Sequence, residues 1–599
     1  MREILCSGQA RSLEFPYPGG MAALCWSPAG ERGELTVSLH YDGAYGMGEK
    51  YNAVNQKGHT AVNEVEEKFC FQGEKTYCPA PFFWTNTGFG LYAATDERTS
   101  FRFGEKAVCA ELPVDCRVVL FSGMPGEIIR DYMDLFGPAK LPPKWAFGPW
   151  ISANHWDSQE KVERAVAQAE EHGFPVCALV AEAWSDEATF YVFRGARYVP
   201  KPNGGAFRLE DFDFSDSPWP DPAGMVQRLH EKGIRFLLWQ IPVYKKQGPD
   251  EPLNAQNELD QADAVARGLC VHNADGSPYT IPEGYWFAGS MIPDFTNPAA
   301  EETWFSKRNY LTEMGIDGFK TDGGEFIYRE DVRFADGSSG RAGKNRYAQE
   351  YTAAYTKHLG SAQALFSRAG YAGQHTTPIH WAGDQQSQNS ELASALRAGL
   401  SAALTGIPFW GFDIGGFAGP LPTLDLYRRA TQMACFVPVM QWHSEPDGGQ
   451  FRELMPGGEG NNERSPWNLA AAYGKTEFVD EMRFWHNLRM ELLPYLYSVA
   501  LDCAEASKPM MRPLVYQWPE DPLVWDCEDE FLLGDSLLVA PLLEENAEKR
   551  AVYLPEGQWI GLFDRRAAAG GQTIVAGGDR RLPVFLRAGY GLALRSDAN

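Results

Sequence analysis

The chain has 599 residues, of which 44% are hydrophobic and 13% aromatic, so it is long enough for two to four domains, one of them large. Its 79 acidic and 54 basic residues give a net charge of −25, which argues against nucleic acid as a partner because phosphate contacts need clustered Lys and Arg. The eleven cysteines include no CxxC pair, so we expect neither a disulfide framework nor a zinc knuckle. The start of the chain has no signal-peptide pattern, and nowhere do eighteen apolar residues run together. We therefore expect a cytoplasmic protein with no membrane partner.

Three regions follow one another along the chain. Residues 1–140 alternate short apolar runs with Gly, Pro and Asn, which predicts an N-terminal β-sandwich. Residues 141–495 alternate apolar runs with segments of helical period, such as SQEKVERAVAQAEEHG and PAGMVQRLHEKG, which is typical of repeated βα units. Residues 496–599 return to strand and turn signals after the helical segment RMELLPYLYSVALDCAEA, so we predict a C-terminal β-sandwich.

The middle region contains eight candidate strands, the number that a (β/α)8 barrel of the α/β class needs. They are FGPWISAN, VCALVAEAW, IRFLLWQIP, GFKTDGGE, ALFSRAG, IHWAGD, GIPFWGFDIGG and FVPVMQWHSEP. Almost all end in polar or charged residues, and the C-terminal strand ends build the active site in this fold. The insertions at about 185–220 and 245–290 are long for βα loops, and we expect them to shape the pocket.

Two carboxylates stand at predicted strand ends. Asp322 lies in GIDGFKTDGGE with Lys320 and Glu325, and Asp384 ends PIHWAGD. An unpaired buried carboxylate is costly, so a charge at such a place needs a reason. Two carboxylates that face one pocket are the minimum for glycoside hydrolysis, in which one attacks the anomeric carbon and the other protonates the leaving oxygen. A structural Lys-Asp pair is the alternative interpretation of the first segment.

The segments KTDGGE, FSRAGYAG, HWAGD and FWGFDIGGF, in this order and approximate spacing, resemble glycoside hydrolase family 31. YGMGEKYN and PFFWTNTGFGLY are similar to that family's N-terminal domain, and LLGDSLLVAPLLEENAEKRAVYLPEGQW is similar to its C-terminal domain. The resemblance implies a retaining, exo-acting α-glycosidase that acts on a small oligosaccharide or α-glycoside. Relatives in the family are often oligomers, which leaves a homo-oligomer open.

The resemblance also implies a role for each matching residue. Asp322 would be the nucleophile and Asp384 the general acid/base, Arg368 would hold the nucleophile or a sugar hydroxyl, and Lys320 would favour the ionised nucleophile. Four further residues would wall or support the pocket or bind ring hydroxyls, with core packing as the alternative: Trp381, Trp410, Asp413 and His443.

The end of the second predicted strand departs from the family pattern. Many family α-glucosidases have an Asp there, whereas this chain has Glu182 and Trp184 in AEAW. Glu182 could accept hydrogen bonds from O4 and O6 of the sugar, which favours an α-glucoside or an α-galactoside. The context also resembles the sulfoquinovosidases, but a carboxylate repels a sulfonate. Arg194 and Arg197 lie in the same loop, and either could pair with Glu182.

Several alternatives remain at this stage. The KTD form of the nucleophile strand resembles α-xylosidases, and α-N-acetylgalactosaminidases belong to the same family. Transfer of the glycosyl group to another sugar is a different outcome of the same intermediate, and a carbohydrate-binding protein without turnover is a different class.

A metal-dependent hydrolase would use His375, His380 and Asp384, but their spacing does not fit a ligand set. The glycines match no phosphate-binding loop. We therefore expect neither a metal nor a nucleotide cofactor.

Overall fold

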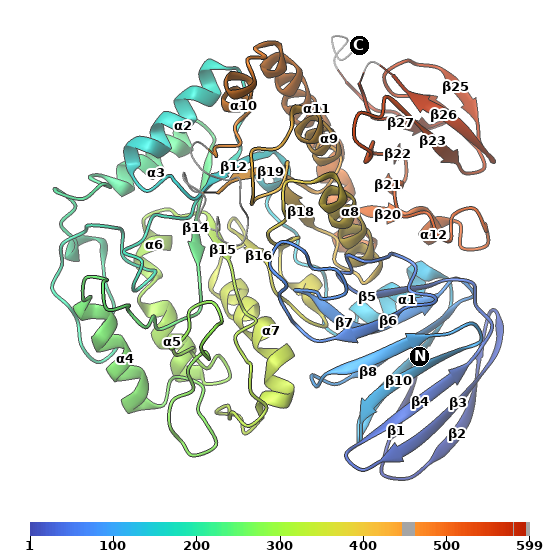
Figure 1. The fold of residues 1–599 in the computed structure, drawn as a ribbon, viewed down its shortest axis with the longest axis horizontal. Coiled ribbons are helices and arrows are strands. Elements are labelled where there is room, and N and C mark those ends of the chain that lie inside the picture. The colour runs from blue at the N-terminus through green and yellow to red at the C-terminus, as the bar shows by residue number, and fades with distance from the viewer. Residues whose placement is uncertain (446–461, 579, 595–599) are drawn as a thin grey trace.

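The computed structural model describes residues 1–445, 462–578 and 580–594. Its centre is a closed barrel of eight parallel strands, β12 to β19, which confirms the predicted fold class. Figure 1 shows the N-terminal sheets in blue at the lower right of the barrel and the C-terminal sheets in red at its upper right. Within the described residues, no helix has the length and apolar character that a membrane crossing requires.

Each predicted barrel strand contains one observed strand. The barrel strands are β12 (Pro149–Ala153), β13 (Ala178–Ala181), β14 (Arg235–Gln240), β15 (Gly318–Thr321), β16 (Ala364–Ser367), β17 (Ile379–Trp381), β18 (Trp410–Asp413) and β19 (Val439–Ser444). The last predicted segment ends at Pro446, which lies outside the described residues. The barrel closes where β12 pairs with β19, with Trp150 beside Gln441. The strands are buried almost throughout, as parallel strands covered by helices must be.

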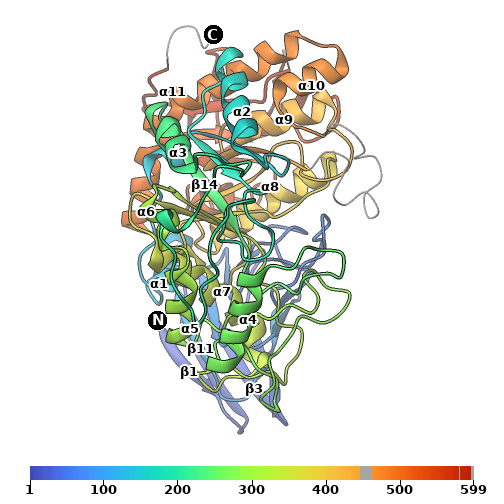
Figure 2. The ribbon, with the colours of Figure 1, turned by 90° about the vertical axis from the view of Figure 1, so that its left-hand side faces the viewer.

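The helices around the barrel follow the predicted periodicity. In α2 (Gln159–Glu171), the hydroxyl of Ser158 caps the amide of Lys161, and Val162 and Val166 are buried on one face. In Figure 2, α2, α3 and α6 lie outside β14. The other helices are α1 (Pro125–Met133), α3 (Pro222–Glu231), α4 (Ala255–Arg267), α5 (Pro298–Ser306), α6 (Asn309–Glu313), α7 (Gly340–His358), α8 (Asn389–Leu404), α9 (Leu424–Ala434), α10 (Pro466–Tyr473), α11 (Glu477–Ala506) and α12 (Leu514–Gln517), with 3-10 turns at Lys144–Phe147, Leu209–Asp211 and Gln374–Thr376.

Two antiparallel sheets form the N-terminal β region. One contains β1 (Arg2–Cys6), β11 (Cys116–Ser122), β8 (Phe89–Ala94), β7 (Pro79–Thr85) and β5 (Ala44–Gly48), and the other contains β2 (Arg11–Tyr17), β3 (Gly20–Ala29), β4 (Arg32–Ser38), β10 (Ala107–Pro113), β9 (Thr99–Phe103) and β6 (Thr60–Asn63). The sheets enclose a core of their own, which includes Trp26, Phe83 and Phe101. Hydrogen bonds such as that from Tyr51 Oη to the carbonyl of Ala382 attach this region to the barrel.

The C-terminal region is also built of β-strands. A six-stranded sheet contains β20 (Met511–Pro513), β21 (Phe531–Leu533), β22 (Leu537–Val539), β27 (Val584–Arg587), β24 (Gln558–Gly561) and β25 (Ala567–Ala569), and β23 (Lys549–Leu554) pairs with β26 (Gln572–Gly577). Its buried residues are continuous with the core of the barrel. The helix α11 before it begins at Glu477, well before the segment from which we predicted it, and its buried side chains link the two regions.

Candidate active site

A cavity of about 230 Å³ opens at the C-terminal end of the barrel. Its lining comes from strand ends and the following loops, where this fold places active sites. The lining residues are Asn154, Glu182, Ala183, Glu187, Trp239, Trp286, Phe287, Lys320, Asp322, Asp384, Phe417 and His443. Asp322 and Asp384, the two carboxylates singled out in the sequence, therefore face one cavity.

Asp322 directly follows β15 and is held by three donors. Its carboxylate accepts hydrogen bonds from the amide of Gly323 at 2.8 Å and from Nε1 of Trp239 at 3.0 Å. Nε of Arg368 lies 3.1 Å from Oδ1. All three contacts stabilise an anion, because each places a donor hydrogen or a positive charge against the oxygens. Together the three contacts fix the orientation of the Asp322 carboxylate, as a nucleophile requires.

Asp384 lies in a different environment, three residues beyond β17. It accepts no hydrogen bond from the described part of the chain, and NH1 of Arg368 is 4.0 Å from Oδ2. Burial and the negative charge of Asp322 hold the pKa of Asp384 well above its usual range. The raised pKa favours the protonated carboxyl, the state that a general acid needs. The preceding Gly383 has φ +69°, and a Cβ there would lie 2.3 Å from the Tyr77 ring, so only glycine fits beside Asp384.

One buried guanidinium, that of Arg368, connects the two aspartates with two further carboxylates. Besides its contacts with Asp322 and Asp384, Arg368 donates to both oxygens of Glu325 at 3.1 and 3.2 Å and lies 3.2 Å from Glu67. Its side chain is 2% exposed. Burial raises the pKa of Glu325, as does the charge of Glu67, although Arg368 opposes both effects. The predicted contact of Arg368 with Asp322 is present, and the two glutamates extend it into a network.

A second ion pair forms one wall of the cavity. Lys320 on β15 donates to Glu182, which follows β13, and Nε2 of His443 on β19 lies 3.2 Å from the same oxygen of Glu182. Burial alone would raise the pKa of Glu182, but His443 and Lys320 lower it to about 2. Burial alone would lower the pKa of Lys320, but the charge of Glu182 raises it. His443 also stacks on Phe417, with ring centroids 4.7 Å apart.

The other predicted site residues lie around this wall. Lys320 forms its ion pair with Glu182, and the charge of Asp322 also raises the pKa of Lys320. Trp381, Trp410, Trp184 and Asp413 are buried outside the cavity lining, and core packing was the alternative interpretation for Trp381, Trp410 and Asp413. Trp381 packs on Lys320 at 4.7 Å, Trp410 donates to Glu49 at 2.7 Å, Trp184 donates to the carbonyl of Trp239 at 3.0 Å, and Asp413 accepts from Gln441 at 2.8 Å.

The two loop arginines whose partner the sequence left open do not pair with Glu182. Arg197 pairs with Asp213 and Asp216 on the surface, and Arg194 lies 3.6 Å from Asp157 and 3.7 Å from Glu187. Within the described chain, the side chains that pair with Glu182 are Lys320 on β15 and His443 on β19.

Sequence reasoning missed Glu67, Trp239, Trp286, Phe287 and Phe417. Both insertions contribute to the lining, with Glu187 from the first and Trp286 and Phe287 from the second. The aromatic run YWF at 285–287 was a usable signal, because it lies in a Gly- and Pro-bounded loop. Glu67 gave no signal, because it stands between β6 and β7 of the N-terminal region and reaches Arg368 only through the fold.

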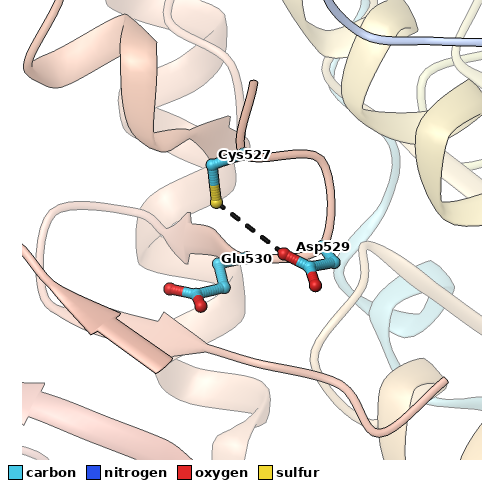
Figure 3. A group of neighbouring side chains, drawn as sticks. All are labelled: Cys527, Asp529 and Glu530. Atoms are coloured by element: carbon cyan, nitrogen blue, oxygen red, sulfur yellow. Dashed lines mark hydrogen bonds between the residues drawn. The ribbon is translucent and has the colours of Figure 1, made fainter. Parts of the chain in front are cut away.

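A group of three potential metal ligands lies far along the chain, in the C-terminal region. Figure 3 shows Cys527, Asp529 and Glu530 side by side, with Sγ of Cys527 3.8 Å from an oxygen of Asp529. Arg550 donates to Asp529 at 2.6 Å and to Glu530 at 3.1 Å, so an arginine already balances these charges. Burial also holds the pKa of the Cys527 thiol well above its usual range, which disfavours the thiolate that binds metals.

The histidines of the metal-hydrolase alternative do not converge on Asp384. Nε2 of His375 lies 2.9 Å from the carbonyl of Gly137, and Nε2 of His380 lies 3.3 Å from that of Gln374. Burial lowers the pKa of both rings. They are neutral side chains bonded to the backbone.

Comparison with known proteins gives consistent matches over nearly the whole chain. Residues 139–499 match the glycosyl hydrolases family 31 TIM-barrel domain, and residues 507–591 match the family 31 C-terminal domain. The chain is 36% identical over 570 residues to an isomaltosyltransferase of Sporosarcina globispora, covering 92% of this chain and 51% of that protein. It is also 36% identical over 560 residues to a 1,3-α-isomaltosidase of Kribbella flavida, covering 91% and 76%. The chain thus spans about half the length of the first relative.

A solved structure is similar as well. The cycloalternan-degrading enzyme from Trueperella pyogenes, in complex with a covalent intermediate, superimposes with a TM-score of 0.88 and 35% identity, covering 97% of this chain and 83% of that one. The same enzyme has been solved with isomaltose.

Proposed function

Because the chain belongs to glycoside hydrolase family 31, we propose that it is a retaining α-glycosidase that releases isomaltosyl units from α-1,3-linked glucosides. The observation that carries the proposal is that Asp322 and Asp384 line one cavity and share one guanidinium, whereas among the described residues hydrogen-bond donors reach Asp322 but not Asp384. This asymmetry favours the proton on Asp384 rather than on Asp322, as double displacement requires.

The reaction then proceeds in two steps. Asp322 attacks the anomeric carbon as the proton of Asp384 passes to the departing glycosidic oxygen, so the α-linkage breaks and a β-linked ester forms. Asp384, now ionised, removes a proton from water. The water oxygen attacks the same carbon, which restores the α-anomer and frees Asp322. Arg368 stays against Asp322 as the charge of the carboxylate is lost and regained.

The wall formed by Glu182, Lys320 and His443 suits sugar hydroxyls. Glu182 is bonded to Lys320 and His443, but a carboxylate offers about four acceptor positions and can still accept from hydroxyls. In an isomaltosyl unit, O6 of the reacting glucose carries the second glucose. The substrate must therefore extend away from the reacting sugar, and the lining does continue to Glu187, Trp286 and Phe287.

Product analysis tests the proposal. With α-isomaltosyl-(1→3)-isomaltose as substrate, we expect isomaltose as the sole early product, formed first as the α-anomer by NMR, and no product from Asp322→Ala. Early release of glucose, or of the β-anomer, would contradict the proposal. So would cleavage of nitrophenyl α-xyloside alone in a panel of nitrophenyl α-glycosides.

Transfer of the isomaltosyl unit to another sugar is the second candidate, favoured by the identity to the isomaltosyltransferase. The same assay separates the two outcomes. Products longer than the substrate, formed in proportion to added acceptor, would identify transfer, whereas isomaltose in stoichiometric yield would identify hydrolysis.

A further inference from the structure

Asp384 depends on its backbone for its position. Among the described residues no hydrogen-bond donor reaches its carboxyl, whereas three contacts orient the carboxylate of Asp322. The direction of Asp384 is therefore set by the segment 382–384, which leaves the barrel directly after β17. A general acid must lie within hydrogen-bond reach of the leaving oxygen, so whatever fixes this segment also determines how well the acid works.

Tyr51, which follows β5 in the N-terminal β region, bonds to the first residue of this segment. Its Oη donates to the carbonyl of Ala382 at 2.8 Å. Tyr51 is buried, and burial together with the charge of Glu49 holds the pKa of its hydroxyl well above the usual range, so the donor keeps its proton. The carbonyl of Tyr51 in turn accepts from Oγ of Ser394 on α8 at 3.1 Å. The hydroxyl thus attaches the segment to a point that is itself fixed.

Tyr77, which precedes β7, lies against the middle of the segment. A Cβ on Gly383 would lie 2.3 Å from Cε2 of Tyr77, so the ring packs closely on the backbone immediately before Asp384. The guanidinium of Arg368 lies over the same ring, 4.7 Å from its centroid. The Tyr77 ring therefore supports both the backbone of Asp384 and the cation that the two aspartates share.

The two tyrosines pack as one unit, which we call the tyrosine platform. Their ring centroids are 6.5 Å apart and their planes meet at 76°, an edge-to-face contact. The carbonyl of Tyr77 accepts from the amide of Gly370 at 3.1 Å, and its hydroxyl donates to Glu67 at 3.3 Å. Both tyrosines are buried and neither belongs to the cavity lining. Any effect that they have on the reaction must therefore pass through other residues.

We propose that the tyrosine platform positions the general acid: it fixes the segment 382–384 and thereby the direction of the Asp384 carboxyl. The role of Asp384 as the acid rests on the proposed function. The N-terminal β region then takes part in the reaction, although it contributes none of the residues that line the cavity. Loss of the platform should impair cleavage most where the leaving group must be protonated.

The test compares two substrates that transfer the same isomaltosyl unit. We measure kcat/KM on α-isomaltosyl-(1→3)-isomaltose, whose leaving sugar must be protonated, and on nitrophenyl α-isomaltoside, whose leaving nitrophenolate need not be. In Tyr51→Phe and Tyr77→Leu, the ratio of the first value to the second should fall about ten-fold, part of the 10²- to 10⁴-fold that a general acid supplies. A loss of folded protein lowers both values equally and leaves the ratio unchanged.

Two variants serve as matched controls. Oη of Tyr45 donates to the carbonyl of Trp525 at 2.8 Å, so Tyr45→Phe removes an equally buried hydroxyl of the N-terminal region away from Asp384, and its ratio should equal that of the wild type. Tyr77→Phe keeps the ring against Gly383 and should recover most of the ratio lost in Tyr77→Leu. An unchanged ratio in Tyr51→Phe and Tyr77→Leu, or an equal fall in Tyr45→Phe, overturns the proposal.

A structural measurement separates failure of this inference from failure of the proposed function. If the wild type cleaves neither substrate, the proposed function fails, and crystal structures of the wild type and of Tyr77→Leu decide the inference. A displacement of the Asp384 carboxyl by about 1 Å supports the tyrosine platform, since a misplacement of that size is enough to disable a catalytic group. Superimposable positions of Asp384 in the two structures overturn it.

Discussion

Replacement of Asp384 by alanine should lower the rate of cleavage most for substrates whose leaving group must be protonated. The buried, protonated Asp384 supplies that proton to the leaving oxygen. A sugar alcohol is a poor leaving group, so kcat/KM on the isomaltosyl tetrasaccharide should fall about 10²- to 10⁴-fold, the usual contribution of a general acid. Nitrophenolate leaves without protonation. The rate of its first release in a burst experiment should therefore change far less, while the steady-state rate falls.

Azide distinguishes the roles of the two aspartates by stereochemistry. In Asp384→Ala, azide enters the space of the lost carboxyl and attacks the β-linked ester, so the product is the α-glycosyl azide. In Asp322→Ala, azide replaces the nucleophile and attacks the α-linked substrate directly, so the product is the β-glycosyl azide. NMR identifies the anomer. If Asp384→Ala yields the β-azide, or loses equal activity on both leaving groups, the assignment of the acid is wrong.

Three further predictions follow from the contacts around these aspartates. Trp239→Phe removes the indole donor to Asp322, so kcat/KM should fall about ten-fold or more, the effect of one lost hydrogen bond to a charged group, and an unchanged kcat/KM would contradict this role. Glu67→Gln removes a negative charge from Arg368, so that Arg368 favours ionised Asp384 more strongly. Activity is lost at alkaline pH as Asp384 deprotonates, so this limb of the kcat/KM profile should move to lower pH. A shift to higher pH would refute the network. Lys320→Met leaves Glu182 as a buried carboxylate without its cation, so the free energy of unfolding in denaturant titrations should fall by about 3–5 kcal/mol. The double variant with Glu182→Gln should recover much of that loss. Additive effects of the two substitutions would contradict the pairing.

The barrel could be predicted because each strand has a local signal. Runs such as ALVA and ALFS are apolar on both faces, and only a parallel strand covered on both sides is so. The polar residues that end these runs converge because all parallel strands of a barrel point the same way. Asp322 and Asp384 were therefore predictable as neighbours, although they are far apart in the chain.

Side-chain direction was not predictable at the same level. Trp410 and Trp381 stand on barrel strands near the catalytic segments, yet both are buried outside the cavity lining: Trp410 donates to Glu49, and Trp381 packs behind Lys320. The partner of Trp410 comes from the N-terminal region, so no pattern within the barrel segments could reveal it. The same reason hid Glu67.

The two aspartates show how one side-chain type acquires two functions from its surroundings alone. The carboxylate of Asp322 accepts hydrogen bonds from a backbone amide and an indole and lies against Nε of Arg368, and each of these contacts stabilises a negative charge. Asp384 receives no donor from the described chain and faces Arg368 only at 4.0 Å, while the charge on Asp322 repels its own. Since Arg368 is shared, whatever strengthens its contact with Asp322 also keeps Asp384 protonated. The nucleophile and the acid are therefore not set independently: together with burial, the negative charge of Asp322 favours the proton on Asp384.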